Sequence, residues 1–418
     1  MEFSIIGCGD RGTIYGDLLV KEGHTIKAIV EPCESRREAA KNRYHICEEM
    51  VFENSDDLYR KGKIGDALII SSLDRNHYEQ CMKALEVGYD ILLEKPISPS
   101  PKECLAIEKK ANELNKIITV GHVLRYTEFF RTLKEIIAGE ELGKVIDIQH
   151  NENIGNFHMA HSFVRGNWRN SDETSPLIMQ KSCHDMDILT WLVDSECKEV
   201  CSYGDLSFFK EENAPKGSSL RCKDCSIKES CIYNAYEAYM PCHGMWPSYV
   251  LTTDQSEEGL RKAIDEGPYG RCVFHCDNNV CDHQVTILKF KNNVTATFNL
   301  SAFTNKCFRS IKVMCERGEI RGADYLNEIE ITKFASNNLA GYEQRVMKLP
   351  RIASGHGGGD SGIIHDFLEL MENRAKENKT SISKSVESHI MAYGAELSRT
   401  TGKNIQLDEL KEELRRSI

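Results

Sequence analysis

The sequence predicts an α/β domain built on a doubly wound parallel sheet, followed by an α+β domain with a large, open and mostly antiparallel sheet. Three observations favour this class. A glycine-rich turn, Gly7-Cys8-Gly9-Asp10-Arg11-Gly12, joins a short apolar strand to a helix. Short apolar strands then alternate with helical patterns as far as residue 122. Beyond that point the predicted strands are longer and alternate polar with apolar residues. We therefore expect one domain over 1–122 and a second over 123–418.

Composition narrows the function classes. The chain has 418 residues, enough for two domains with ordinary cores. Its net charge of −11 argues against a nucleic-acid partner. The N-terminus enters a strand rather than a signal sequence, and no apolar run approaches the length of a membrane span. The 17 cysteines are then expected to be thiols or metal ligands in a reducing compartment. We expect a cytoplasmic protein with no membrane partner.

The first elements have the pattern of a Rossmann dinucleotide-binding unit. A strand over 2–6, a helix over 10–21 and a strand over 25–30 are expected, and the second strand ends on an acid. In such a unit the first glycine permits a tight turn, the second lets the backbone approach a pyrophosphate, and the third lets helix and strand pack closely. Phosphate binds the free N–H groups of the helix start, and the acid binds the adenosine ribose. The predicted cofactor residues are Gly7, Gly9, Asp10, Arg11, Gly12 and Glu31.

The choice of cofactor depends on the charges around Glu31. A carboxylate there accepts hydrogen bonds from ribose hydroxyls and repels a 2′-phosphate, which favours NAD. Arg36 and Arg37 are close in sequence, and an arginine can pair with that phosphate. NADP is therefore the alternative.

Polar residues follow the next strands of the parallel sheet. Strands over 67–71, 90–93 and 117–120 alternate with helices over 35–44, 76–87 and 102–115. Ligands bind beyond the carboxyl ends of such strands. We expect one rim formed by Gly7, Glu31, Ser72, Asp74, Glu94, Lys95 and His122. Further predicted cofactor residues are Ser72, Asp74, Glu94, Lys95 and Pro96.

Glu94-Lys95-Pro96 is the most informative part of this rim. A lysine at the end of a buried strand, followed by proline, is held by stiff backbone and aimed at a ligand. The alternative is a surface Glu-Lys pair that begins a loop.

A helix is expected over 180–193 in the second domain. Its apolar residues include Ile188 and Leu192. Lys181, His184 and Asp187 are spaced three apart and share another face. The alternatives are a solvated polar stripe or a core histidine bonded to the backbone.

Four segments resemble the Gfo/Idh/MocA oxidoreductases, named for glucose–fructose oxidoreductase and inositol dehydrogenase. They are SIIGCGDRG, IISSLDRNHYEQCMKALEVGYDILLEKPIS, GHVLRYTEFF and KSCHDMDILTWLV. The Asn76-His77 helix start and the Glu-Lys-Pro tripeptide are specific to that family, which adds His77 to the cofactor site. The resemblance implies a sugar or cyclitol substrate between the two domains, and a homodimer or homotetramer.

The resemblance also implies the catalytic residues. Lys95 matches the family's active-site lysine, and His184 and Asp187 lie in its active-site helix, with Lys181 beside them. Oxidation of a secondary alcohol needs a base for the hydroxyl proton, and imidazole titrates in the right range. Lys95 would orient the hydroxyl and stabilise charge on its oxygen.

One position departs from the family pattern. Inositol dehydrogenases carry an aspartate four residues before the histidine, where this chain has Gln180. Glutamine can hydrogen-bond a substrate hydroxyl but cannot accept its proton, so Lys181 or Asp187 would have to substitute. A redox-neutral NAD-dependent glycosidase, which oxidises, eliminates and re-reduces, is therefore an alternative. A catalytically silent NAD(P)-sensing regulator is a third.

Other polar residues are candidates for substrate contact. A loop rich in Trp and Arg suits a sugar, whose C–H face stacks on aromatic rings while its hydroxyls bind Arg and Asn. The alternative is an ordinary surface loop. The predicted substrate residues are Arg125, Tyr126, Trp168, Arg169 and Gln180.

A cysteine-rich insertion is expected at about 210–276. Cys222, Cys225 and Cys231 have the spacing of a tetrahedral thiolate site, which needs a fourth ligand. Cys272 is favoured over Cys242, His243 and Cys276, because it would fix the far end of the insertion. A structural zinc ion is the first expectation. An iron–sulfur cluster and scattered free thiols are the alternatives.

Overall fold

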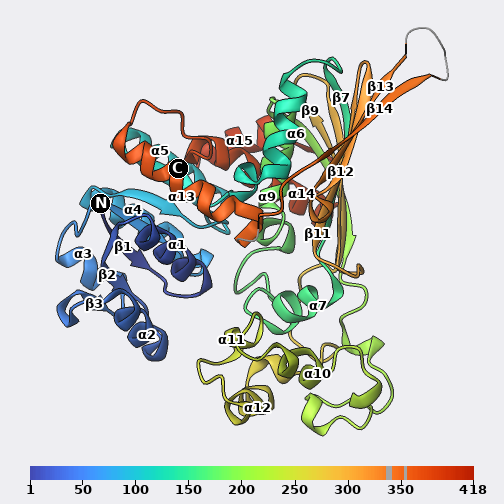
Figure 1. Ribbon diagram of the computed structural model, residues 1–418. Coiled ribbons are helices and arrows are strands. Elements are labelled where there is room, and N and C mark those ends of the chain that lie inside the picture. Colours follow the sequence, from blue (N-terminus) through green and yellow to red (C-terminus); the bar gives the residue numbers. More distant parts are fainter. Residues whose placement is uncertain (336–340, 353–354) are drawn as a thin grey trace.

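A computed structural model describes residues 1–335, 341–352 and 355–418. The chain forms two sheets (Figure 1). The first has six strands in the order β3-β2-β1-β4-β5-β6, and the second has nine in the order β14-β13-β12-β11-β7-β10-β9-β8-β15.

The first sheet is parallel throughout. Strands β4 and β5 are buried along their whole length, because helices cover both faces. This confirms the predicted doubly wound sheet. The strands are β1 (Glu2–Ile6), β2 (Thr25–Val30), β3 (Val51–Phe52), β4 (Ala67–Ile70), β5 (Asp90–Leu93) and β6 (Ile118–Val120), and the helices are α1 (Asp10–Lys21), α2 (Glu34–Tyr44), α3 (Ser55–Arg60), α4 (Asp74–Val87) and α5 (Pro101–Glu113).

The second sheet is mixed. Strands β7 and β10 run parallel, and the other neighbours run antiparallel. Burial alternates along β9, because helices α6, α9 and α14 cover one face of the sheet (Figure 1). The strands are β7 (Val145–Asn153), β8 (Cys197–Asp205), β9 (His283–Phe290), β10 (Thr295–Ser301), β11 (Phe308–Cys315), β12 (Gly318–Ala323), β13 (Glu328–Phe334), β14 (Tyr342–Lys348) and β15 (Ile405–Gln406), and the helices outside the insertion are α6 (Glu128–Ala138), α7 (Asn156–His158), α8 (Leu177–Gln180), α9 (Cys183–Val193), α13 (Gly359–Glu372), α14 (Ile382–Thr401) and α15 (Leu407–Arg415).

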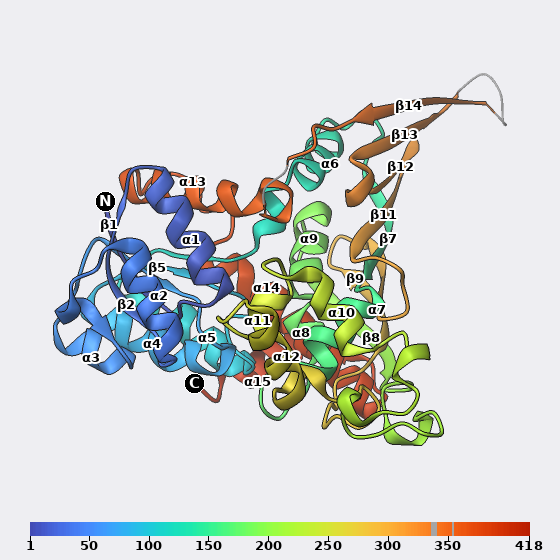
Figure 2. The same ribbon diagram turned by 60° about the horizontal axis from the view of Figure 1, so that its bottom comes forward.

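Helix α13 joins the two domains. It lies late in the chain, yet Ile363 and Phe367 are fully buried in the same apolar cluster as Phe3 and Ile5 of β1. It packs beside α1, as the rotated view shows (Figure 2). The start of α13 is therefore held next to the glycine-rich turn.

The insertion has a small apolar core of its own. Its helices are α10 (Ala235–Tyr239), α11 (Ser248–Leu251) and α12 (Glu257–Glu266). Tyr239, Leu260 and Ile264 are buried together with Cys222 and Tyr269. These contacts give the insertion a packed core among its own residues.

The predicted zinc site is not supported. Within residues 1–335, 341–352 and 355–418, no three His, Cys, Asp or Glu side chains gather as metal ligands. Instead, the buried guanidinium of Arg165 donates to the carbonyls of Arg271 (2.7 Å) and Tyr233 (2.6 Å), with Nη2 at 3.7 Å from Cys222 Sγ. A cation and apolar contacts thus hold the insertion. The expected ligands Cys222, Cys225, Cys231 and Cys272 are not assembled, and neither zinc nor an iron–sulfur cluster is assigned.

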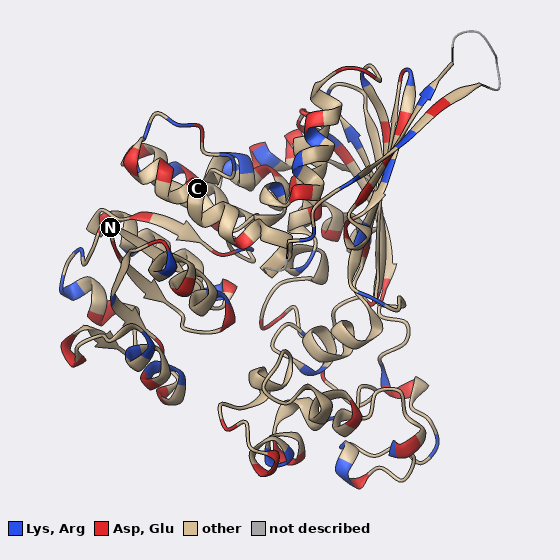
Figure 3. Ribbon diagram, in the orientation of Figure 1, with Lys and Arg blue, Asp and Glu red and all other residues tan. Residues whose placement is uncertain are grey.

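Two further features concern the whole chain. Acidic and basic residues are interspersed along the helices of both domains (Figure 3). Among the described residues, no helix is both long enough and apolar enough to span a membrane.

Candidate functional site

The glycine-rich turn has the geometry expected of a pyrophosphate loop. Gly7 has φ of +91°, and a Cβ on it would lie 2.7 Å from the backbone of Ser71. A Cβ on Gly12 would lie 2.0 Å from the carbonyl oxygen of Gly7, so helix and strand pack too closely for a side chain. Nothing lies within 4 Å of a Cβ on Gly9, which leaves the start of α1 open to a ligand.

Glu31 is fixed beside this turn. Its buried carboxylate accepts hydrogen bonds from the backbone N–H groups of Cys8 (2.9 Å) and Cys33 (3.0 Å). Arg36 Nη2 lies 2.9 Å from Glu31 Oε1. The acid is therefore at the end of β2, where an adenosine ribose would be bound, and Arg36 is engaged with it.

Arg11 does not extend toward the open side of the turn. Its Nε lies 2.8 Å from Glu94 Oε1 and its Nη2 lies 2.8 Å from Asp360 Oδ1, on α13. Tyr15 donates to Glu94 at 2.6 Å. Burial opposes the charge of Glu94, but Arg11 and Lys95 outweigh it and lower the pKa of Glu94. The Nε and Nη2 of Arg11 are therefore engaged within the protein rather than at the predicted phosphate position.

His77 links the ends of β4 and β5. Its Nδ1 lies 2.9 Å from the carbonyl oxygen of Pro96, and its Nε2 lies 3.0 Å from that of Ser72. The Ser72 hydroxyl donates to Gln80 at 2.6 Å. The structure thus places Ser72 and Pro96 at neighbouring strand ends, joined by the His77 ring, while the Ser72 hydroxyl binds Gln80 of α4.

Lys95 reaches from β5 to the second domain. Its Nζ donates to the carbonyl oxygen of Gln180 at 3.2 Å. Burial lowers the pKa of Lys95, against the opposing effects of Cys183 and Glu94. The lysine therefore lies between the parallel sheet and the helix pair α8–α9.

The predicted helix over 180–193 is interrupted. Helix α8 ends at Gln180 and α9 begins at Cys183, so the chain changes direction at Lys181 and Ser182. The prediction of one continuous helix was wrong, because local periodicity does not show a break that lasts only two residues. As a result, the carbonyl group of Gln180 is free to accept from Lys95.

His184 lies in the first turn of α9 and is 6% exposed. Its ring meets that of His122 edge-on at 5.6 Å, and His122 meets His389 at 5.6 Å. Burial, with the charge of Lys95, lowers the pKa of His184 well below 6.5. The imidazole is therefore neutral, in its base form, at neutral pH.

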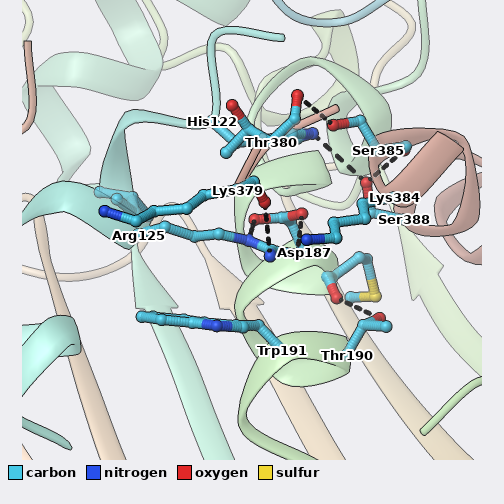
Figure 4. A network of polar contacts seen from close by, with 12 residues as sticks. His122, Arg125, Asp187, Thr190, Trp191, Lys379, Thr380, Lys384, Ser385 and Ser388 are labelled. Atoms are coloured by element: carbon cyan, nitrogen blue, oxygen red, sulfur yellow. Dashed lines mark hydrogen bonds and ion pairs between the residues drawn. The ribbon is translucent and has the colours of Figure 1, made fainter. Parts of the chain in front are cut away.

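Asp187 and Arg125 bind each other in the core (Figure 4). Both Arg125–Asp187 contacts are 2.7 Å, and Arg125 also donates to the carbonyl of Lys379 at 2.9 Å. The guanidinium lies 5.4 Å from the ring of Trp191. The two residues thus form a buried ion pair, and Asp187 lies three residues after His184 on α9.

Lys181 points toward the large sheet. Its Nζ lies 3.4 Å from Glu152 Oε1, while Arg309 Nη2 lies 2.7 Å from Glu152 Oε2. Arg309 Nε also lies 2.7 Å from Asp185 Oδ1. Burial opposes ionisation of Asp185, but Arg309 and His150 lower its pKa to about 2. The break before α9 separates Lys181 from His184 and Asp187, which stay three residues apart on the same helix.

The other predicted substrate residues are dispersed. Tyr126 donates to Asp366 of α13 at 2.9 Å, and Arg169 makes two contacts of 2.7 Å with Asp277. Trp168 is 38% exposed. Their contact with substrate stays a prediction.

The insertion contacts the start of α1 through helix α11. Tyr249 of α11 donates to Asp10 Oδ1, at the start of α1, at 2.9 Å. Trp246 lies 5.5 Å from the ring of His158. Burial, with Lys181, lowers the pKa of His158 well below 6.5. An aromatic wall therefore lies next to the charged groups of the site.

Several site residues were missed by sequence reasoning. Tyr15 and Ser175 carry no motif that would single them out. Arg309 had a signal, because it shares the buried face of β11 with Ile311 and Val313, where an arginine is out of pattern.

Family models match almost the whole chain. Residues 1–122 match the model of an oxidoreductase family with an NAD-binding Rossmann fold, and residues 134–407 match that of an oxidoreductase C-terminal alpha/beta domain.

Individual proteins are more distant. The protein YteT of Bacillus subtilis is 23% identical over 324 residues, which cover 75% of this chain and 74% of YteT. An inositol 2-dehydrogenase of Leifsonia xyli subsp. xyli is 26% identical over 206 residues, covering 47% of this chain and 55% of that relative. A solved structure of levoglucosan dehydrogenase with NADH and L-sorbose has a TM-score of 0.73 and 14% identity, covering 97% and 98% of the two chains. At that identity the likeness shows the fold alone.

Proposed function

The chain belongs to the Gfo/Idh/MocA family of oxidoreductases, and from that membership we propose that it is an NAD-dependent enzyme acting on a secondary hydroxyl of a sugar, a sugar derivative or a cyclitol. One observation carries the proposal. The contact from Lys95 Nζ to the carbonyl of Gln180 brings the end of β5 against the segment that carries His184. A lysine and a neutral imidazole are thus held together at the domain interface.

The chain's own groups divide the work. NAD, bound at the β1–α1 turn, supplies the hydride acceptor. His184 takes the hydroxyl proton. Because its Nδ1 is enclosed without a partner among the described residues, Nε2 is the nitrogen that faces substrate. Lys95 donates to the substrate oxygen and stabilises its developing negative charge.

NAD is favoured over NADP. The carboxylate of Glu31 lies at the end of β2, where a Rossmann unit binds the ribose, and Arg36 is already paired with it. A 2′-phosphate would meet that carboxylate and would have to compete for Arg36.

The substrate class is supported by the aromatic wall and by the names of relatives. Sugars stack their C–H faces on aromatic rings, and Trp246 and His158 offer such a surface. Relatives and structural neighbours carry the names inositol 2-dehydrogenase and levoglucosan dehydrogenase.

A redox-neutral reaction is the second candidate, and two observations favour it. Gln180 cannot accept a proton where inositol dehydrogenases carry an acid. The contact between Tyr249 and Asp10 places the insertion over the cofactor loop, where it would slow the release of NAD.

One experiment separates these candidates. The purified protein is assayed for bound nucleotide and is then mixed with NAD and a panel of sugars, cyclitols and aryl glycosides. Net formation of NADH supports the dehydrogenase. Aglycone release with retained NAD and no net reduction supports the glycosidase. Bound nucleotide with neither outcome would replace both by a NAD(P)-sensing regulator.

A further inference from the structure

Asp74 meets Gln180 across the interface between the two domains. Asp74 begins α4 and is 3% exposed. Its Oδ2 accepts from Gln180 Nε2 at 2.7 Å and from the Ser175 hydroxyl, and its Oδ1 accepts from the backbone N–H of Arg75 at 3.0 Å. Three donors and a helix N-terminus therefore stabilise this buried carboxylate.

The carboxylate fixes the orientation of the Gln180 side chain. An ionised carboxylate only accepts hydrogen bonds, so the amide nitrogen of Gln180 must face it. Nε2 also lies 3.2 Å from Ser175 Oγ, which leaves Oε1 on the other edge of the amide group, pointing away from Asp74. The main-chain carbonyl of the same residue accepts from Lys95. Gln180 is thus held at both ends by groups of the NAD-binding domain.

We propose that Asp74 is a positioning residue, and that it holds Gln180 Oε1 as a fixed acceptor for a substrate hydroxyl beside His184. This rests on the proposed function. In the dehydrogenase pattern the acid stands four residues before the histidine. In this chain that position is the amide Gln180, and the acid it contacts is Asp74, on the other side of the interface between the two domains. The site then selects substrates that present a hydrogen-bond donor to Gln180 and rejects those with a carboxylate or ketone there.

Exchanging the two groups tests the proposal. Gln180→Glu puts two carboxylates within hydrogen-bond distance, where they repel or must share a proton. Asp74→Asn leaves two amides, so the Gln180 side chain can turn over. The double variant, Asp74→Asn with Gln180→Glu, restores one amide and one carboxylate in exchanged positions. Asp56→Asn, on exposed α3, is the control.

The expected result is coupling between the two positions. Each single variant should lower kcat/KM about 10- to 100-fold, the cost of an unmatched buried polar group. Most of the loss should fall on KM for Asp74→Asn. The melting temperature should fall for Gln180→Glu, and the double variant should recover most of both losses. NADH affinity, measured by fluorescence, should stay within about threefold throughout, a difference below 1 kcal/mol.

Two results would overturn the proposal. Additive single effects, with no recovery in the double variant, would mean that the pair does not act together. A loss of NADH affinity in Asp74→Asn that Gln180→Glu does not rescue would place Asp74 in the cofactor site instead. The melting-temperature cycle needs no turnover. If the melting temperatures show coupling between Asp74 and Gln180 but the protein oxidises no sugar of the panel, the proposed function would be rejected while the interaction of the two side chains would stand.

Discussion

At the scale of single residues, burial decides the chemistry of His184. Its ring, on the first turn of α9, is buried against the ring of His122, and the charge of Lys95 adds to the cost of protonation. His184 is therefore neutral and able to accept a proton at neutral pH. A solvated histidine with a pKa near 6.5 would be partly protonated there.

The pH profile of wild type should report this shift. Because the pKa of His184 is lowered, the acidic limb of kcat/KM should lie below pH 6.5 and the rate should be flat near pH 7. In His184→Asn the acidic limb should disappear, and kcat/KM should fall about 10²- to 10⁴-fold. A limb centred above pH 6.5, or one that persists in the variant, would mean that another group is the base.

The buried ion pair of Arg125 and Asp187 should matter for stability more than for chemistry. Arg125→Ala leaves Asp187 buried without its cation, and should lower the free energy of unfolding by about 3–5 kcal/mol. Urea denaturation measures the change. Arg131→Ala is the control, since Arg131 is half exposed and pairs on the surface of α6, where about 0.5 kcal/mol is expected. Equal effects in the two variants would contradict the supporting role of Arg125.

At the scale of elements, the sequence located most of the first domain. Strands β1, β2 and β5 and helix α1 have the expected bounds, because a buried parallel strand is apolar along its length and glycine or an acid ends it. The short β3 and α3 were missed, because two apolar residues and a six-residue helix leave little periodicity. Strands β12 and β14 were also missed. In β14 every residue is exposed, so no alternation marks it.

The α8–α9 break shows what the sequence could not predict in the site. Spacing of three placed Lys181, His184 and Asp187 on one face, but the break leaves only His184 and Asp187 on the same helix. Their real partners, Glu152 and Arg125, come from distant segments. Such long-range pairing leaves no trace in local sequence.

A row of three buried histidines links α9, the end of β6 and α14. Burial lowers the pKa values of His122, His184 and His389, the last to about 3. Below pH 6.5 the unfolded chain binds protons that the folded chain does not, so the free energy of unfolding should fall on acidification, by about 1.4 kcal/mol per pH unit for each such histidine.

Chemical denaturation between pH 6.5 and 5 tests this, because carboxylates titrate mostly below that window. His389→Gln should lower the slope of the free energy of unfolding against pH by up to the contribution of one proton, about 1.4 kcal/mol per pH unit. His365→Gln, at an exposed position, should leave it unchanged. A slope of opposite sign, or one that His389→Gln does not alter, would be inconsistent with a neutral histidine row.

At the scale of the whole molecule, the uncovered face of the large sheet is mostly polar but carries a group of exposed apolar side chains on β8 and β9. Tyr203, Val285 and Ile287 are 67%, 44% and 51% exposed, and the first two are cross-strand partners on β8 and β9. We expect this face to form the interface of the predicted homodimer or homotetramer.

Light scattering after size-exclusion chromatography tests the oligomer. Ile287→Lys should give a species of lower mass, because a buried unpaired charge opposes association. Val20→Lys, which places the same charge on exposed α1, should not. A monomeric wild type, or an unchanged mass in Ile287→Lys, would exclude this face as the interface.

The two sheets were predictable from the sequence, and the details of how the chain connects them were not. Glycine spacing and strand character indicated both sheets. The return of α13 to the first sheet was not indicated, because its apolar residues fit either domain. The cysteine spacing predicted a metal, and an arginine with an apolar cluster holds the insertion instead.

The central claim is that Lys95 acts on the substrate oxygen beside a bound nicotinamide. Lys95→Ala tests it most directly, by following the reduced-nicotinamide absorbance with the substrate found in the panel and measuring NADH affinity on the same samples. The account predicts NADH affinity within about threefold of wild type, and a kcat lower by about 10²- to 10³-fold, the usual effect of removing one stabilising donor. Unchanged turnover in Lys95→Ala, with NADH bound, would contradict it.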